Sequence, residues 1–190
     1  MNLNVLGDAL DFWKGRLLNR LTSAGLLLNL EVHPLLTDQQ EWQDPDFALY
    51  AELLMILPQA IHPIAGVENT AGDLFLDPNI GVQTSPVPVA EQVNYVTSIE
   101  VARLANASPS RVVAVYQHVS RRPVRDRVGA VVARLQAVEP GLSVCSVESG
   151  TVAMLFASRS AERVRSIDQS FAVLFRDRAL VRAHLWPGVA

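Results

Sequence analysis

The sequence predicts an α+β fold in which a mixed or antiparallel sheet is flanked by helices. Apolar residues recur at three- and four-residue spacing in some segments and alternate with polar residues in others, which indicates both helices and strands. Residues 110–190 follow the order β-α-β-β-α-β, the split β-α-β arrangement of ferredoxin-like folds. Hydrophobic residues make up 49% of the chain and charged residues 18%, as in proteins that bury a substantial core.

The first part of the chain, residues 1–109, begins with an amphipathic helix. Leu6, Leu10 and Trp13 recur at the spacing of one helical face, and Gly25 follows as a stop signal. Later segments are interrupted by Pro and Gly, so the predicted strands are short. The predicted elements are a helix at 6–23, a strand at 26–32, a loop at 35–46, a short helix at 47–53, a strand at 54–61, a loop at 62–72, a strand from Asp77-Pro78 to near Pro86, and a helix at 89–107.

The second part, residues 110–190, alternates strands and helices more regularly. Pro123 precedes a helix, Ser149-Gly150 turns a hairpin, and Ser160 is placed to cap the last helix. The predicted elements are a strand at 111–119, a helix at 124–138, strands at 142–149 and 151–158, a helix at 160–177 and a strand at 179–186.

The apolar positions of these elements predict the core of the second part. The predicted core residues are Val112, Val115, Val128, Val132, Leu135, Val144, Val152, Leu155, Val164, Ile167, Phe171 and Leu174. Removing a buried Phe or Leu typically costs about 2–5 kcal/mol. We therefore expect Phe171→Ala to destabilise the protein far more than Arg163→Ala.

The two parts carry opposite charge, although the whole chain has a net charge of only −3. Residues 1–109 hold four basic and thirteen acidic side chains, whereas residues 110–190 hold twelve arginines and six acidic side chains. The sequence leaves two arrangements open. The second part is an added ferredoxin-like unit, or both parts share one continuous sheet.

Four arginines, Arg121, Arg122, Arg125 and Arg127, cluster between a predicted strand and a predicted helix. Such clusters contact phosphates in nucleic-acid-binding proteins, lie in solvent, or contact another protein. No aromatic residues are interleaved with this cluster, and the whole chain is acidic. We therefore favour a solvated face or a protein contact over sequence-specific binding of nucleic acid.

No sequence motif for catalysis or metal binding occurs in the chain. The four histidines lack the spacing of zinc ligands, and there is no P-loop or dinucleotide-binding glycine motif. Cys145 lies in the middle of a predicted strand, as a buried residue rather than a nucleophile. Asp73, Asp77 and Glu68 could hold a cation or serve as paired carboxylates, but Asp77-Pro78 is more typical of a turn. We expect no cofactor, no metal, no catalytic residue and no enzymatic activity.

The sequence also gives no sign of a membrane span or an export signal. No apolar run approaches the roughly 20 residues that cross a bilayer. The N-terminal segment lacks the basic and apolar regions of a signal peptide. Because Cys145 is the one cysteine, no internal disulfide is expected. We expect a protein of a reducing compartment that does not contact membranes.

Four segments follow one another between residues 54 and 104: an apolar strand ending in proline, LMILP; a Gly/Asn-rich loop, GVENTAG; a strand with an aromatic residue and an Asp, LFLDPNIGVQTSPVPV; and a helix, EQVNYVTSIEVARLANA. An opening helix followed by LLNLEVHPL precedes them. This layout resembles a group of phage tail-completion and tail-terminator-like proteins. The resemblance covers the first 110 to 119 residues, and it consists of patterns of secondary structure rather than catalytic signatures.

The resemblance implies a virion structural protein of the phage tail or neck, assembled in the host cytoplasm. Proteins of this kind form rings, often hexameric, that terminate the tail tube or join it to the head connector. The implied partners are copies of the chain itself, tail-tube proteins and head-connector proteins. Passage of DNA through the ring is compatible with this role, and sequence-specific binding of nucleic acid is not expected.

The opposite charges of the two parts suit a head-to-tail ring, because each contact in such a ring joins unlike surfaces. The candidate interface residues are Arg121, Arg122, Arg125, Arg127, Asp73 and Asp77. Two other functions stay open from the sequence. One is a ferredoxin-like regulatory module that binds a small molecule, and the other is an enzyme whose site forms no recognisable motif.

Overall fold

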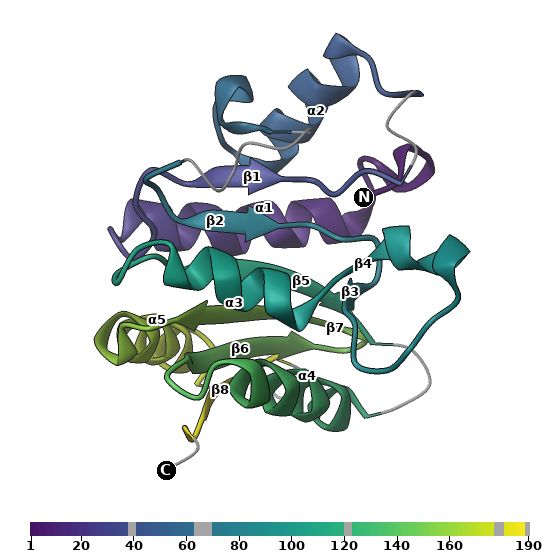
Figure 1. Ribbon diagram of the computed structural model, residues 1–190. Helices are drawn as coiled ribbons and strands as arrows, with labels where there is room; N and C mark the ends of the chain where they lie inside the picture. The colour runs from purple at the N-terminus through teal and green to yellow at the C-terminus, as the bar shows by residue number, and fades with distance from the viewer. Residues whose placement is uncertain (38–40, 63–69, 120–122, 177–180, 189–190) are drawn as a thin grey trace.

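The computed structural model describes residues 1–37, 41–62, 70–119, 123–176 and 181–188. A six-stranded mixed sheet lies between two layers of helices (Figure 1). Across the sheet, the strands are β1 (Glu31–His33), β2 (Leu74–Leu76), β5 (Val113–His118), β7 (Val152–Ser158), β6 (Ser143–Ser149) and β8 (Val181–Trp186). β1, β2 and β5 are parallel, and the remaining neighbours pair antiparallel. The predicted α+β class is confirmed.

Helices cover both faces of the sheet, and each face has its own hydrophobic core. α1 (Ala9–Ser23), α2 (Asp44–Leu54) and α5 (Ala161–Leu174) belong to one side, and α3 (Ser98–Asn106) and α4 (Val124–Val138) to the other. Phe156 and Phe171 are buried on the first side, and Val128 and Leu155 on the second. Within the described residues, no helix is both long and apolar enough to cross a membrane.

The elements of the second part agree closely with the sequence prediction. α4 has the predicted bounds, and the hydroxyl of Ser160 accepts a hydrogen bond from the Arg163 N–H as the cap of α5. Eleven of the twelve predicted core residues are buried. The exception is Leu174, which lies at the end of α5 and is 43% exposed.

The strand order of the second part is not the ferredoxin-like one. A ferredoxin-like order would place β8 beside β5, but that position is occupied by β2. β8 pairs instead with β6 at the far edge of the sheet. The segment β5-α4-β6 is still a split β-α-β unit, since β7 lies between the two strands. The two parts of the chain therefore share one continuous sheet.

The first part departs further from the prediction because its backbone turns at positions that hydrophobicity does not reveal. The strand predicted at 26–32 is reduced to β1, since Asn29 has a positive φ of 48°. The strand predicted at 54–61 does not form. Met55 has a φ of 58° and ends α2, and Ile61 makes a single bridge to Val32.

Two further predictions in the first part are wrong. The strand predicted from Asp77-Pro78 to near Pro86 is reduced to the two residues of β3 (Gly81–Val82), while β2 lies before this range and ends at Leu76. The helix expected at 89–107 is three elements: the 3-10 helix η5 (Val89–Asn94), the strand β4 (Tyr95–Val96) and α3. The Thr97 hydroxyl accepts from the Glu100 N–H and so starts a new helix at this point.

Candidate functional site

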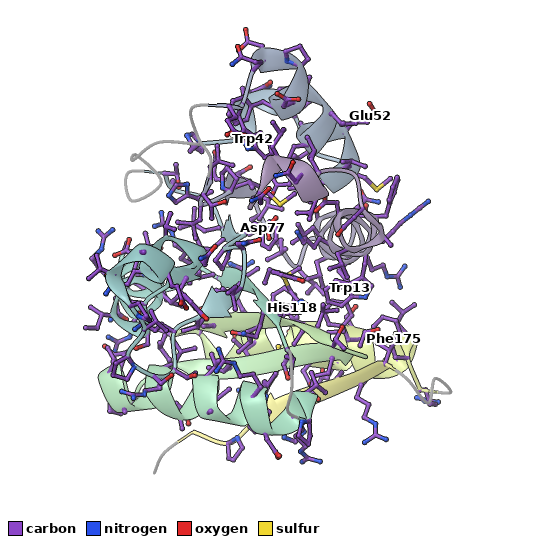
Figure 2. All side chains as sticks on the ribbon, turned by 90° about the vertical axis from the view of Figure 1, so that its right-hand side faces the viewer. Trp13, Trp42, Glu52, Asp77, His118 and Phe175 are labelled. Carbon is purple, nitrogen blue, oxygen red and sulfur yellow. The ribbon has the colours of Figure 1, made fainter. Side chains whose placement is uncertain are left out.

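Three charged side chains are buried together beside the first strands of the sheet. The Lys14 ammonium of α1 lies 2.9 Å from a carboxylate oxygen of Asp11 and 2.9 Å from Oδ2 of Asp77. The Tyr50 hydroxyl of α2 donates to the same Asp77 oxygen at 2.6 Å. The ammonium also lies 4.5 Å from the centre of the Tyr116 ring. We call these five residues the Lys14 network; its Asp77 lies in the interior of the molecule (Figure 2).

The Lys14 network lies at the carboxyl ends of the parallel strands, where α/β sheets commonly bind ligands. Asp77 directly follows β2, and His118 is the last residue of β5. Both line a crevice of about 290 Å³, together with Asp8 and Asn79. Oδ1 of Asp77 is buried, and no described residue gives it a hydrogen bond. Ligands commonly bind at this place in α/β sheets, so we next consider the protonation of the side chains in the network.

The lysine and the two tyrosines of the network hold their protons in the folded chain. Burial lowers the pKa of Lys14, but the charges of Asp77 and Asp11 and the hydrogen bonds to both bring that pKa above its ordinary value. Burial is also the main cause that raises the pKa of Tyr50 and of Tyr116. A lysine and two tyrosines that stay protonated are neither nucleophiles nor general bases. Through its contacts the network joins α1, α2 and β5 to Asp77 at the end of β2.

A second ion pair, between the buried Asp73 and the partly buried Arg163, joins the two parts of the chain. Arg163 of α5 donates to both carboxylate oxygens of Asp73 at 2.8 Å, and to the carbonyl oxygens of Ser110 and Leu26 at 2.6 and 2.7 Å. Asp73 also accepts from two backbone N–H groups. Arg163 is thus a structural residue, so its loss should cost more than the ranking of Arg163→Ala far below Phe171→Ala assumes.

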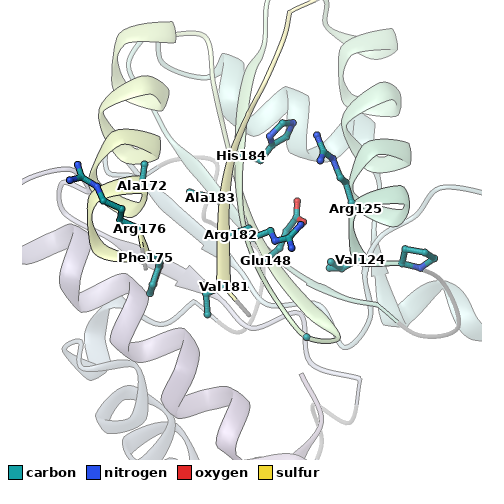
Figure 3. A pocket seen from close by; sticks show the side chains of 12 residues that line it. Val124, Arg125, Glu148, Ala172, Phe175, Arg176, Val181, Arg182, Ala183 and His184 are labelled. Carbon is teal, nitrogen blue, oxygen red and sulfur yellow. The ribbon is translucent and has the colours of Figure 1, made fainter. Parts of the chain in front are cut away.

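A pocket of about 590 Å³ lies at the beginning of β8 (Figure 3). Its volume is within the range of roughly 300–1,000 Å³ that ligand pockets have. We call it the β8 pocket. Its lining residues are Pro123, Val124, Arg125, Glu148, Gly150, Ala172, Phe175, Arg176, Val181, Arg182, Ala183 and His184.

Charged and apolar surfaces meet in the β8 pocket. Arg125, Arg182 and His184 lie on the α4 side of β8, whereas Phe175, Val181 and Arg176 lie on the α5 side (Figure 3). This division follows from the alternation of side chains along a strand. The pocket therefore offers guanidinium groups next to an apolar surface.

One acidic side chain, Glu148, is among the residues that line the pocket. It is 5% exposed, and the hydroxyl of Ser146 donates to it at 3.0 Å. Arg182 is opposite Glu148 in the β6–β8 register, yet the two charged groups form no ion pair within the described chain. Arg125, Arg176 and Arg182 are exposed, and none has an ion pair among the described residues. Their charge is available to an anionic partner.

The structure separates the predicted arginine cluster. Arg125 is exposed and lines the β8 pocket. Arg127 instead donates to the hydroxyl of Thr84, in the segment that follows β3. Arg121 and Arg122 lie outside the described residues.

The two predicted acidic interface residues lie inside the subunit. Asp73 is 2% exposed and Asp77 is 1% exposed. Their partners, Arg163 and Lys14, belong to the same chain. Neither carboxylate is therefore part of the described surface, and this expectation is corrected.

Sequence reasoning missed Lys14, Arg163, Arg176 and Arg182. A signal for Lys14 was present, since it is the one lysine of the chain and follows Asp11 by three residues. The other three depend on the fold. Their neighbours in space come from distant segments, and no local spacing reveals these contacts.

Cys145 is buried in β6, and burial raises the pKa of its thiol, as suits a core residue. Within the described part of the chain, no group of three or more His, Cys, Asp or Glu residues is placed to hold a metal ion. Comparison with models of protein families, with curated proteins and with solved structures finds no match.

Proposed function

We propose that the chain is a structural subunit that associates head to tail with copies of itself, in a ring of the kind that terminates a phage tail tube or joins it to the head connector. One observation carries this proposal. The charge difference between the two parts of the chain is laid out along the sheet. β1 and β2 of the acidic part lie at one end, and β6 and β8 of the arginine-rich part lie at the other (Figure 1).

The exposed charges follow the same division. Asp44 and Glu52 are exposed on α2 beside β1, while Arg125, Arg176 and Arg182 are exposed around β8. Contact between two acidic ends, or between two arginine-rich ends, is repulsive, whereas contact between unlike ends is attractive. A repeated contact between unlike surfaces generates a ring when its rotation closes.

The chemistry of the interior supports a role without catalysis. The crevice at the ends of β2 and β5 is lined by Lys14 and Tyr116, whose raised pKa values keep both side chains protonated. In this proposal the partners beyond the chain itself are tail-tube and head-connector proteins, and the site of action is the virion. DNA passes the ring without being read in sequence.

The native mass of the purified chain tests this function. We expect a single species whose mass is a fixed multiple of 20.8 kDa, seen as a ring by electron microscopy. Salt should slow assembly, since screening at about 0.15 M limits exposed charge pairs to about 8 Å. A chain that stays at 20.8 kDa at about 100 μM, far above the Kd of a stable contact, would contradict the proposal.

A further inference from the structure

Helix α2 presents a face to solvent that no described part of the chain covers. Asp44, Leu49 and Glu52 are exposed on it, and Met55 and Leu57 are exposed directly after its end. The exposed fractions of Leu49, Met55 and Leu57 are 43%, 46% and 64%. Figure 2 shows Glu52 at the outer edge of the molecule. We call these five residues the α2 ridge.

The α2 ridge and the β8 pocket match in chemistry. The ridge combines two carboxylates with three large apolar side chains. The pocket combines Arg125, Arg176 and Arg182 with the apolar Phe175 and Val181. Apolar contact surrounded by paired charges is the usual composition of a protein interface. The three arginines outnumber the one glutamate of the pocket, so its net charge is opposite to that of the ridge.

We propose that the α2 ridge of one copy docks in the β8 pocket of the next copy. This inference rests on the proposed function, because it names the two surfaces that form the head-to-tail contact. The carboxylates of Asp44 and Glu52 approach Arg125 and Arg182. Leu49 and its apolar neighbours cover the apolar side of the pocket.

A second copy is the occupant because of where the two surfaces lie. The ridge stands beside β1, and the pocket stands at β8, the opposite edge of the same sheet (Figure 1). A subunit therefore cannot place its own ridge in its own pocket. Two copies can, and the pair then keeps one free ridge, on one copy, and one free pocket, on the other, for further copies.

A charge exchange between the two surfaces tests the docking. Glu52→Arg and Arg182→Glu each place like charges together, and we expect each to weaken self-association about tenfold or more. The double variant Glu52→Arg/Arg182→Glu restores an opposite pair and should recover most of the loss. Glu91→Arg and Arg134→Glu are matched controls, since both residues are exposed and neither belongs to the ridge or the pocket. Sedimentation of each folded variant, checked by circular dichroism, gives the Kd.

The outcomes separate the docking from the proposed function. A monomeric native chain would overturn both. A native oligomer that neither single variant weakens, or that the double variant fails to restore, would overturn the docking and leave head-to-tail assembly standing. Binding of inorganic phosphate that Arg182→Glu abolishes, in a chain whose oligomer is unaffected by either single variant, would assign the pocket to a small anion and overturn the docking.

Discussion

The two ends of the sheet use charge in different ways. At the β1 end, Asp11, Asp73 and Asp77 are buried and paired with Lys14 and Arg163 inside the subunit. At the β8 end, the arginines of the β8 pocket lie at the surface without such partners in the described chain. Several acidic side chains of the first part therefore stabilise the fold through ion pairs. The exposed arginines of the second part can instead contact a partner.

This difference also explains how each end is stabilised. The second part has strands of six and seven residues whose apolar side chains contribute to the cores on both faces of the sheet. The first part has strands of two and three residues, which bury little apolar area each. Ion pairs between distant residues fix the position of these short strands. Loss of a buried charge should thus damage the first part as much as loss of a large apolar side chain damages the second.

The largest effect is expected at Lys14. Lys14→Met leaves Asp11 and Asp77 buried without a counter-charge, which should lower the free energy of unfolding by about 3–5 kcal/mol. Urea denaturation measures the change. Arg16→Met, at an exposed position of the same helix, should change it by about 0.5 kcal/mol or less. Equal unfolding midpoints for the two variants would show that the network does not stabilise the fold.

The second part provides the apolar counterpart. Phe171 is fully buried between Phe156 and Phe175, and Phe171→Ala should cost about 3–5 kcal/mol through lost burial and a cavity. Leu174→Ala, three residues further along α5, should cost less than about 1 kcal/mol because Leu174 is largely exposed. Similar losses from both variants, in the same urea experiment, would mean that α5 is rotated from the orientation described here.

Arg163 tests the link between the two parts. Arg163→Ala removes four hydrogen bonds and leaves the buried Asp73 carboxylate without its counter-charge. We therefore expect the free energy of unfolding to fall by about 2–4 kcal/mol. Arg165→Ala is the control, since Arg165 is exposed on the same helix and should matter by about 0.5 kcal/mol. The prediction fails if thermal unfolding does not distinguish the two.

The smallest effect concerns alkaline pH. The pKa values of Lys14, Tyr50 and Tyr116 are all raised, so above about pH 10 the folded chain holds more protons than the unfolded chain. Stability should therefore fall as pH rises beyond about 10, and these three groups add no slope at neutral pH. Tyr116→Phe should make that fall shallower. The free energy of unfolding, measured by urea denaturation between about pH 9 and 11, gives the two slopes. The same slope for the native chain and Tyr116→Phe would contradict a raised pKa of Tyr116.

The sequence predicted the elements of the second part because strand and helix periodicity there runs over six to fifteen residues. It failed in the first part for local reasons: the positive φ of Asn29 and Met55 interrupts two apolar runs that read as strands. It failed on strand order for a non-local reason. Whether β8 or β2 borders β5 depends on packing between the two parts.

The candidate site was predictable only in part. Arg125 stood out in a local cluster of arginines, but Arg182 and Phe175 join it through the pairing of β8 and the end of α5. Asp77 was read as a turn residue because its partner Lys14 is 63 residues away. The residue counts predicted the sign of the net charge at each end of the sheet. They could not predict which charged side chains are buried and which are exposed, because that depends on the fold.

One mixing experiment tests head-to-tail association most directly. Glu52→Arg disables the α2 ridge, and Ala172→Trp fills the β8 pocket from an exposed position of α5. At a concentration between the Kd of the native contact and the weaker Kd of the variants, each variant alone should be monomeric at 20.8 kDa. A mixture should form a 1:1 dimer and nothing larger, because one intact ridge meets one intact pocket. A mixture that stays monomeric while the native chain assembles, or variants that assemble alone, would contradict this mode of association.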